Sequence, residues 1–130
     1  MRYPNGILNC AAFLVVAACA SGGQATRSTS TELTREEMAT INAANLYEAV
    51  QRLRPRWLEV RGERSFNMPV EIVVFENNTL LGGPEALRDL TPSSIDRLRY
   101  IDGPRASATL PGLGTRAVQH AIVIEMRRQE

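Results

Sequence analysis

The sequence predicts a single small α+β domain, a mixed β-sheet with short helices, behind an N-terminal export segment. The chain has 130 residues, and once the apolar N-terminus is set aside the remainder is long enough for one hydrophobic core. Apolar residues recur at helical spacing before residue 58, and β-branched or alternating runs follow from residue 70. Helical and strand segments are interleaved along the chain, which is typical of α+β domains.

The charged residues argue against a nucleic-acid partner. The chain contains no lysine, and its 15 arginines nearly balance 14 acidic residues, for a formal net charge of +1. Arginines and glutamates alternate between residues 52 and 64 and form no block of one sign. A surface that neutralises phosphates is therefore not expected.

The N-terminus has the features of a bacterial lipoprotein signal peptide. Residues 7–18 are almost entirely apolar, a run too short to cross a bilayer comfortably and of the right length for a signal-peptide core. The run ends in Val16-Ala17-Ala18-Cys19, which resembles the lipobox, where small residues precede a cysteine that is lipidated before cleavage. We expect a signal peptide at residues 1–18 and a lipid on Cys19. The alternatives are an ordinary signal peptide cleaved at a small residue and an uncleaved anchor.

A lipidated Cys19 implies attachment to the cell envelope. One acyl chain holds a protein only reversibly, whereas two or more, at about 0.8 kcal/mol per buried methylene, hold it stably. Ala20 stands where aspartate is the proteobacterial signal for inner-membrane retention, so the resemblance implies the periplasmic face of the outer membrane. Small polar residues predict a flexible tether at residues 19–33, with the domain at residues 34–130. Cys10 leaves with the signal, so no thiol is expected in the domain.

Two helices are expected first in the domain. Thr34 and Glu37 have the spacing of a capping box, which predicts a short helix with Met38 and Ile41 as its buried contacts. A second start signal at Asn45 precedes an amphipathic helix. The apolar face of this second helix consists of Leu46, Val50, Leu53 and Trp57.

The segment around Pro55, which should end the second helix, is open to two interpretations. Arg54, Arg56 and Trp57 could form a basic and aromatic recognition patch. Trp57 also continues the apolar face of the helix, which favours packing in the core, with the arginines as a solvated rim.

A β-hairpin and two helical turns are expected next. Residues 70–75 are β-branched and apolar, and Asn77-Asn78 suits a two-residue turn into residues 79–81 because asparagine tolerates a positive φ. Proline at a first helical position predicts short helical turns at Pro84 and Pro92.

Two more strands are expected in the last third of the chain. Alternating residues predict a half-buried strand at residues 96–101, which Gly103-Pro104 ends, and a final strand at residues 121–127. A short helix and a loop at residues 111–115 lie between them. In the first of these strands Leu98 and Tyr100 lie on one side and Arg97 and Arg99 on the other. In the last strand Ile122, Ile124 and Met126 lie on one face and Val123, Glu125 and Arg127 on the other.

The order of these segments matches a known pattern. A strand and turn at residues 71–78 are followed by an isoleucine-led strand, Gly-Pro and short helix at residues 95–108, a glycine-rich loop at residues 112–115 and a last strand at residues 121–125. In this order and spacing, the second half of the chain, from Val70, resembles the plug domain of TonB-dependent outer-membrane receptors. The resemblance implies a plug-like α+β fold and a domain that binds without chemistry of its own.

Three positions depart from the plug pattern. Asn77-Asn78 replaces the usual Asp-Gly, Leu110-Pro111-Gly112 replaces an aromatic residue and glycine, and Gln119-His120 replaces the glycine before the last strand. These changes weaken an inherited role in gating a ligand. The sequence also stops at Glu130 without the many strands of a receptor barrel, so we expect a plug-like domain with a different task.

No catalytic, metal or cofactor site is expected. His120 is the only histidine, and without a Gly-x-Ser-x-Gly elbow it is more readily a structural or surface residue than part of a triad. The loop at residues 112–115 lacks the lysine and third glycine of nucleotide-binding loops, which favours a turn. Asp96 and Asp102 are not spaced as a metal or glycosidase pair.

The sequence therefore predicts a non-enzymatic envelope lipoprotein whose plug-like domain binds another protein, such as an outer-membrane receptor, through loops or an exposed sheet edge. The alternative is a small-ligand-binding envelope lipoprotein with a shallow pocket, and an enzyme is least favoured. The candidate binding residues are Arg54, Arg56, Gly112, Gly114 and Thr115.

Overall fold

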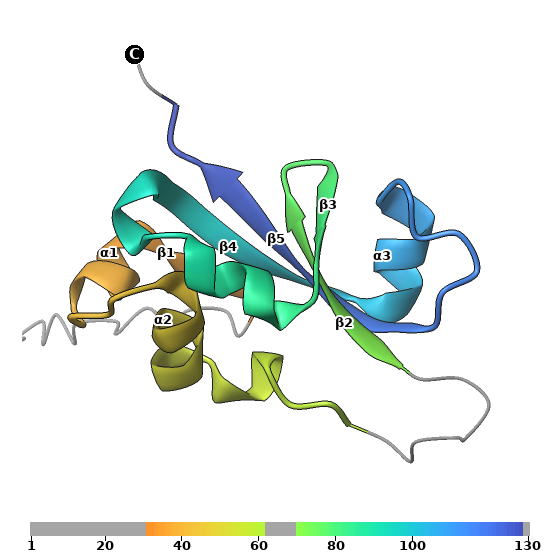
Figure 1. The fold of residues 1–130 in the computed structure, drawn as a ribbon, viewed down its shortest axis with the longest axis horizontal. Coiled ribbons are helices and arrows are strands. Elements are labelled where there is room, and N and C mark those ends of the chain that lie inside the picture. Colours follow the sequence, from red (N-terminus) through yellow and green to blue (C-terminus); the bar gives the residue numbers. More distant parts are fainter. Residues whose placement is uncertain (1–30, 62–69, 129–130) are drawn as a thin grey trace, which may run out of the picture.

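The computed structural model describes residues 31–61 and 70–128, and these form one five-stranded mixed sheet flanked by short helices (Figure 1). The strands lie in the order β1-β4-β5-β2-β3, and all neighbours are antiparallel except β5 and β2, which are parallel. This arrangement confirms the predicted α+β class and mixed sheet. The strands are β1 (Glu32–Thr34), β2 (Glu71–Glu76), β3 (Thr79–Gly82), β4 (Ile95–Asp102) and β5 (Val118–Met126).

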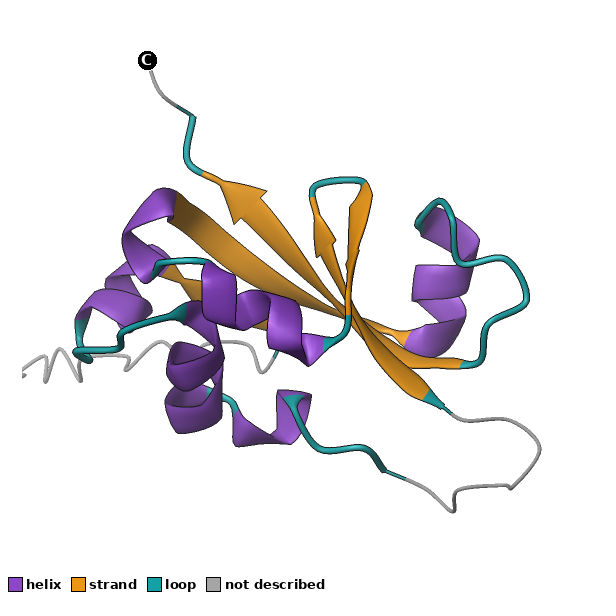
Figure 2. Ribbon diagram, in the orientation of Figure 1, coloured by secondary structure: helices purple, strands orange, loops and turns teal. Residues whose placement is uncertain are grey.

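The helices divide unequally between the two faces of the sheet (Figure 2). They are α1 (Arg35–Ala39), α2 (Leu46–Leu53) and α3 (Gly103–Thr109), with 3₁₀ turns η1 (Pro55–Trp57), η2 (Pro84–Asp89) and η3 (Pro92–Ser94). The first face packs against residues of α1, α2, η1 and η2, and this layer holds the larger core. Its sheet side consists of Leu33, Ile72, Val74, Ile95, Leu98, Ile122 and Ile124.

The second face is covered by α3 at one end only. Val73, Phe75, Ala121 and Val123 pack there with Ala106 of α3. Beyond the end that α3 covers, the same face of β4 and β5 carries charged side chains in place of apolar ones, as the alternation of the strands predicts. In the described part of the chain, one sheet face therefore packs against several helical segments, and the other is covered by α3 at one end only.

The two helix caps and the hairpin turn predicted from the sequence are present in the structure. Thr34 accepts a hydrogen bond from the Glu37 amide at 3.3 Å, and the Glu37 carboxylate accepts one from the Thr34 amide at 3.2 Å, which completes the capping box of α1. Met38 is buried, as predicted. Asn45 caps α2, and Asn77 has a φ of 53° in the two-residue turn between β2 and β3.

The Gly103-Pro104 pair both ends β4 and begins α3. Asp102 Oδ1 accepts a hydrogen bond from the Arg105 amide at 3.0 Å and so caps the helix. A Cβ at Gly103 would lie 2.0 Å from the Val118 carbonyl oxygen of β5. Glycine is therefore required for α3 to start this close to the sheet.

The structure differs from the expected boundaries at three places. The strand β1 was not predicted, and because Leu33 in it is fully buried, the domain begins at or before Glu32 and not at residue 34. The last strand begins at Val118, three residues before the predicted start. Trp57 is buried as expected, but it lies in η1, because α2 ends at Leu53.

Candidate functional site

A cavity of about 410 Å³ opens between η1 and the neighbouring ends of β4 and β5; we call it the Trp57 cavity. The side chains that matter for its chemistry come from segments far apart in the sequence. They are Arg54, Arg56, Trp57, Arg61, Tyr100 and Gln119. The cavity thus joins three arginines to two aromatic rings.

The aromatic part of the Trp57 cavity rests on His120. The Trp57 carbonyl oxygen lies 2.7 Å from His120 Nε2, and the Trp57 amide donates to the Arg54 carbonyl at 2.9 Å. The Tyr100 ring lies between the other two, with centroids 4.6 Å from His120 and 5.8 Å from Trp57. These contacts fix both rings that line the cavity.

Burial lowers the pKa of His120, and the nearby charge of Arg61 lowers it further, against the opposing effect of the hydrogen bond to the Trp57 carbonyl. His120 is 1% exposed, so the neutral imidazole is favoured and its Nε2–H donates to that carbonyl. Within the described residues, Nδ1 has no hydrogen-bond partner. The histidine is a buried structural residue, one of the two roles expected for it.

Gln119 holds the chain that carries Arg61. Its Oε1 accepts a hydrogen bond from the Arg61 amide at 2.7 Å, and its Nε2 donates to the Glu59 carbonyl at 3.0 Å. The backbone of Arg61 is therefore fixed at the rim of the Trp57 cavity, while its side chain stays exposed.

Arg54 is not part of a solvated rim, contrary to the expectation from sequence. Only 14% of its side chain is exposed, and it forms an ion pair with Glu37 at 2.9 Å. It also donates to the carbonyls of Leu53 at 2.9 Å and Glu32 at 3.1 Å. Because it ties β1, α1 and α2 together, Arg54 has a structural role. Arg56, by contrast, is exposed as predicted.

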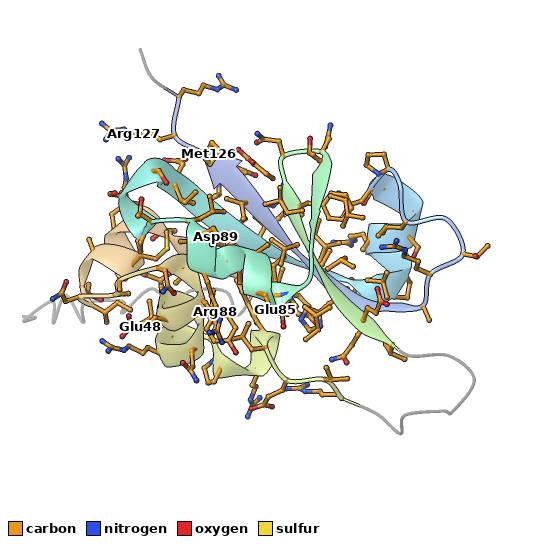
Figure 3. All side chains as sticks on the ribbon, viewed as in Figure 1. Glu48, Glu85, Arg88, Asp89, Met126 and Arg127 are labelled. Carbon is orange, nitrogen blue, oxygen red and sulfur yellow. The ribbon has the colours of Figure 1, made fainter. Side chains whose placement is uncertain are left out.

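A second candidate surface lies on the uncovered part of the sheet; we call it the arginine face. Arg97 Nε lies 2.6 Å from Glu125 Oε2, and Arg99 Nη1 lies 3.3 Å from Glu125 Oε1. Figure 3 shows Met126 and Arg127 at the end of β5, on the opposite side of the view from α3. The hollow over this face measures about 770 Å³ and is lined by Arg35, Arg97, Arg99, Arg127 and Arg128, against the carboxylates of Asp96 and Glu125.

The predicted site residues do not come together in one place. Arg54 and Arg56 line the Trp57 cavity, whereas Gly112, Gly114 and Thr115 are exposed in the turn before β5 and do not line it. Both glycines have a positive φ, which supports the interpretation of this segment as a turn. Cys19 lies outside the described residues.

Sequence reasoning missed Arg61, Tyr100 and Gln119 as parts of a cavity. Tyr100 was assigned to a buried strand face, and nothing in the local pattern placed it beside Trp57. The one available signal was the Gln119-His120 pair, which departs from the glycine of the plug pattern. Those two residues hold Arg61 and Trp57 in place.

No group of three or more histidine, cysteine, aspartate or glutamate side chains in residues 31–61 and 70–128 could hold a metal ion. Over the same residues, every helix is too short or too polar to cross a membrane. The sequence matches no protein-family model, no curated protein and no solved structure.

Proposed function

We propose that this chain is a lipid-anchored protein of the bacterial cell envelope, without a reaction of its own, whose plug-like domain docks to an acidic surface on a second envelope protein. The observation that carries the proposal is the arginine face, a charged half of a sheet that no described helix covers. The lipobox ending at Cys19 supports the location. The order of hairpin, strand, short helix, glycine turn and last strand supports the plug-like assignment.

Charge decides what the arginine face would bind. Five arginines line the hollow. Arg35 pairs with Asp96, Arg97 and Arg99 pair with Glu125, and Arg99 also lies 4.0 Å from Glu32, so among the described residues the positive excess is that of Arg127 and Arg128. Because Arg97 and Arg99 lie on β4, their backbone positions are fixed by the sheet, and their backbone loses little conformational entropy on binding. Complementary charge speeds encounter and selects an acidic partner over a basic one. An acidic protein surface on the same membrane is the partner that fits.

Tethering adds to such an interaction. A lipid on Cys19 confines the domain near the membrane surface, which raises the effective concentration of any partner in that membrane. A docking face of modest affinity is then sufficient. The same face on an unanchored chain would bind less.

The test places a photo-crosslinking amino acid at position 99 in living cells. We expect one envelope protein to be captured, with its crosslinked peptide rich in aspartate and glutamate. Capture should fall strongly in an Arg97→Glu, Arg127→Glu background, because like charges repel. The Cys19→Ser chain should capture less.

The matched control carries the crosslinker at Arg105, an exposed arginine on α3. Equal capture from positions 99 and 105, capture that survives the charge reversal, or no capture at all would each refute docking through the arginine face.

A further inference from the structure

We propose that the Trp57 cavity binds a small planar organic anion, an aromatic carboxylate or an aromatic phosphate ester, whose ring lies against Tyr100, next to the exposed part of Trp57, and whose charge meets Arg56 and Arg61. This site is separate from the arginine face, and it gives the chain a ligand in addition to its proposed docking partner.

The anion preference comes from the two rim arginines. Neither Arg56 nor Arg61 forms an ion pair with a described residue, whereas Arg54 beside them is held by Glu37. Each exposed guanidinium offers a planar fork of donors that matches a carboxylate or phosphate. The rim thus carries positive charge that the described part of the domain does not neutralise.

The preference for a flat ring comes from the floor of the cavity. Tyr100 is half-buried and contributes part of its side chain to the lining, whereas Trp57 is 4% exposed and contributes only a small part of its surface. A planar group can pack against the Tyr100 ring, and such an aromatic contact is favourable beyond the area buried. Leu53 and Pro55 add apolar surface to the lining.

The cavity is held in shape before a ligand arrives. Gln119 fixes the backbone at Arg61, and His120 fixes the backbone at Trp57, both through hydrogen bonds from β5. A volume of about 410 Å³ lies within the range of about 300–1,000 Å³ that is usual for small-molecule sites. A preformed site of this size fits one aromatic ring with its acidic group.

The experiment uses Trp57 as its own reporter, because it is the only tryptophan of the chain. The lipidated protein, in a neutral detergent, is titrated with benzoate and with phenyl phosphate while tryptophan fluorescence and the melting temperature are recorded. Benzamide, which has the shape of benzoate without its charge, and acetate, which has the charge without the ring, are the matched ligands. We expect saturable binding of at least one aromatic anion, and at least about tenfold weaker binding of benzamide and acetate.

Arg56→Gln and Arg61→Gln should each weaken that binding by about tenfold, because each removes one charged partner. Both side chains are exposed, so the fold is retained, and Arg105→Gln on α3 should leave binding unchanged. Whichever of benzoate and phenyl phosphate binds with the higher affinity shows whether the site prefers a carboxylate or a phosphate ligand. The proposal fails if neither anion changes fluorescence or melting at about 1 mM. Benzamide binding as tightly as benzoate, or Arg105→Gln weakening binding as much as the rim variants, would also overturn it.

Discussion

His120 shows how one buried side chain links stability to the candidate cavity. Its Nε2 is bound to the Trp57 carbonyl and its ring lies against Tyr100, so it supports both aromatic residues from within the core. Burial, and then the charge of Arg61, lower its pKa from the ordinary value. Because it is the only histidine, its titration is not masked by another imidazole.

The lowered pKa of His120 predicts a loss of stability in mild acid. In the unfolded chain the imidazole takes up a proton as the pH falls through about 6.5, whereas in the folded chain it stays neutral to a lower pH. Protons therefore favour unfolding in this window, and the stability present above pH 6.5 is lost as the pH falls toward the folded pKa. We expect urea unfolding to give a free energy that decreases by up to about 1.4 kcal/mol per pH unit there.

The control for this prediction is His120→Gln, which keeps a donor near the Trp57 carbonyl and cannot titrate. Its free energy of unfolding should be lower at neutral pH and flat across the same window. A wild-type free energy that does not change between about pH 7.5 and 5.5 would contradict the buried neutral histidine.

At the scale of single elements, α2 depends on Asn45, the residue that caps its N-terminus. Asn45 Oδ1 accepts a hydrogen bond from the Glu48 amide at 2.9 Å, and the Leu46 amide reaches the Leu90 carbonyl at 2.9 Å. The helix is only eight residues long, too short to be stable in isolation. Its cap and its packing therefore both matter.

Asn45→Ala should lower the free energy of unfolding by about 1 kcal/mol, because it leaves the Glu48 amide without its side-chain acceptor. The measurement is urea unfolding followed by circular dichroism. Asn42→Ala is the matched control, since Asn42 is exposed before the helix and its one hydrogen bond within residues 31–61 and 70–128 is accepted by its backbone carbonyl. Equal losses in the two variants would show that the cap is not the cause.

The elements that sequence predicted well are those whose signals are local. The capping box at Thr34, the Asn45 cap and the Asn77-Asn78 turn each depend on atoms within a few residues. By contrast, β1 has three residues and no periodicity. It forms a strand because it pairs with β4, where Leu33 is buried opposite Leu98. Its stability is a property of the assembled sheet, so no local pattern could reveal it.

The candidate cavity was predictable only in part, for the same reason. Arg56 was singled out because it neighbours an aromatic residue in sequence. Tyr100 and Gln119 reach the cavity through the pairing of β4 with β5, and Arg61 through a hydrogen bond to a residue far along the chain. These residues meet because of the order in which the strands pair, and the spacing of residues along the sequence does not reveal that order.

At the scale of the whole molecule, anchoring is expected to depend on one atom, the sulfur of Cys19. Two or more acyl chains on it should keep the protein in the membrane fraction through washes with salt and carbonate. Cys19→Ser should move the protein out of that fraction, as followed by fractionation and immunoblotting. Cys10→Ser, which changes the other cysteine, should leave the distribution unchanged. A Cys19→Ser chain that stays with the membrane would support an uncleaved anchor.

The position of β5 has a consequence for the order in which the molecule is built. It lies between β4 and β2, yet it is the last strand along the described chain. Until it arrives, the β1–β4 pair and the β2–β3 hairpin are separate fragments that share no ladder, and neither has a complete core. We therefore expect a chain that emerges N-terminus first to complete its sheet only after residues 118–126 have emerged.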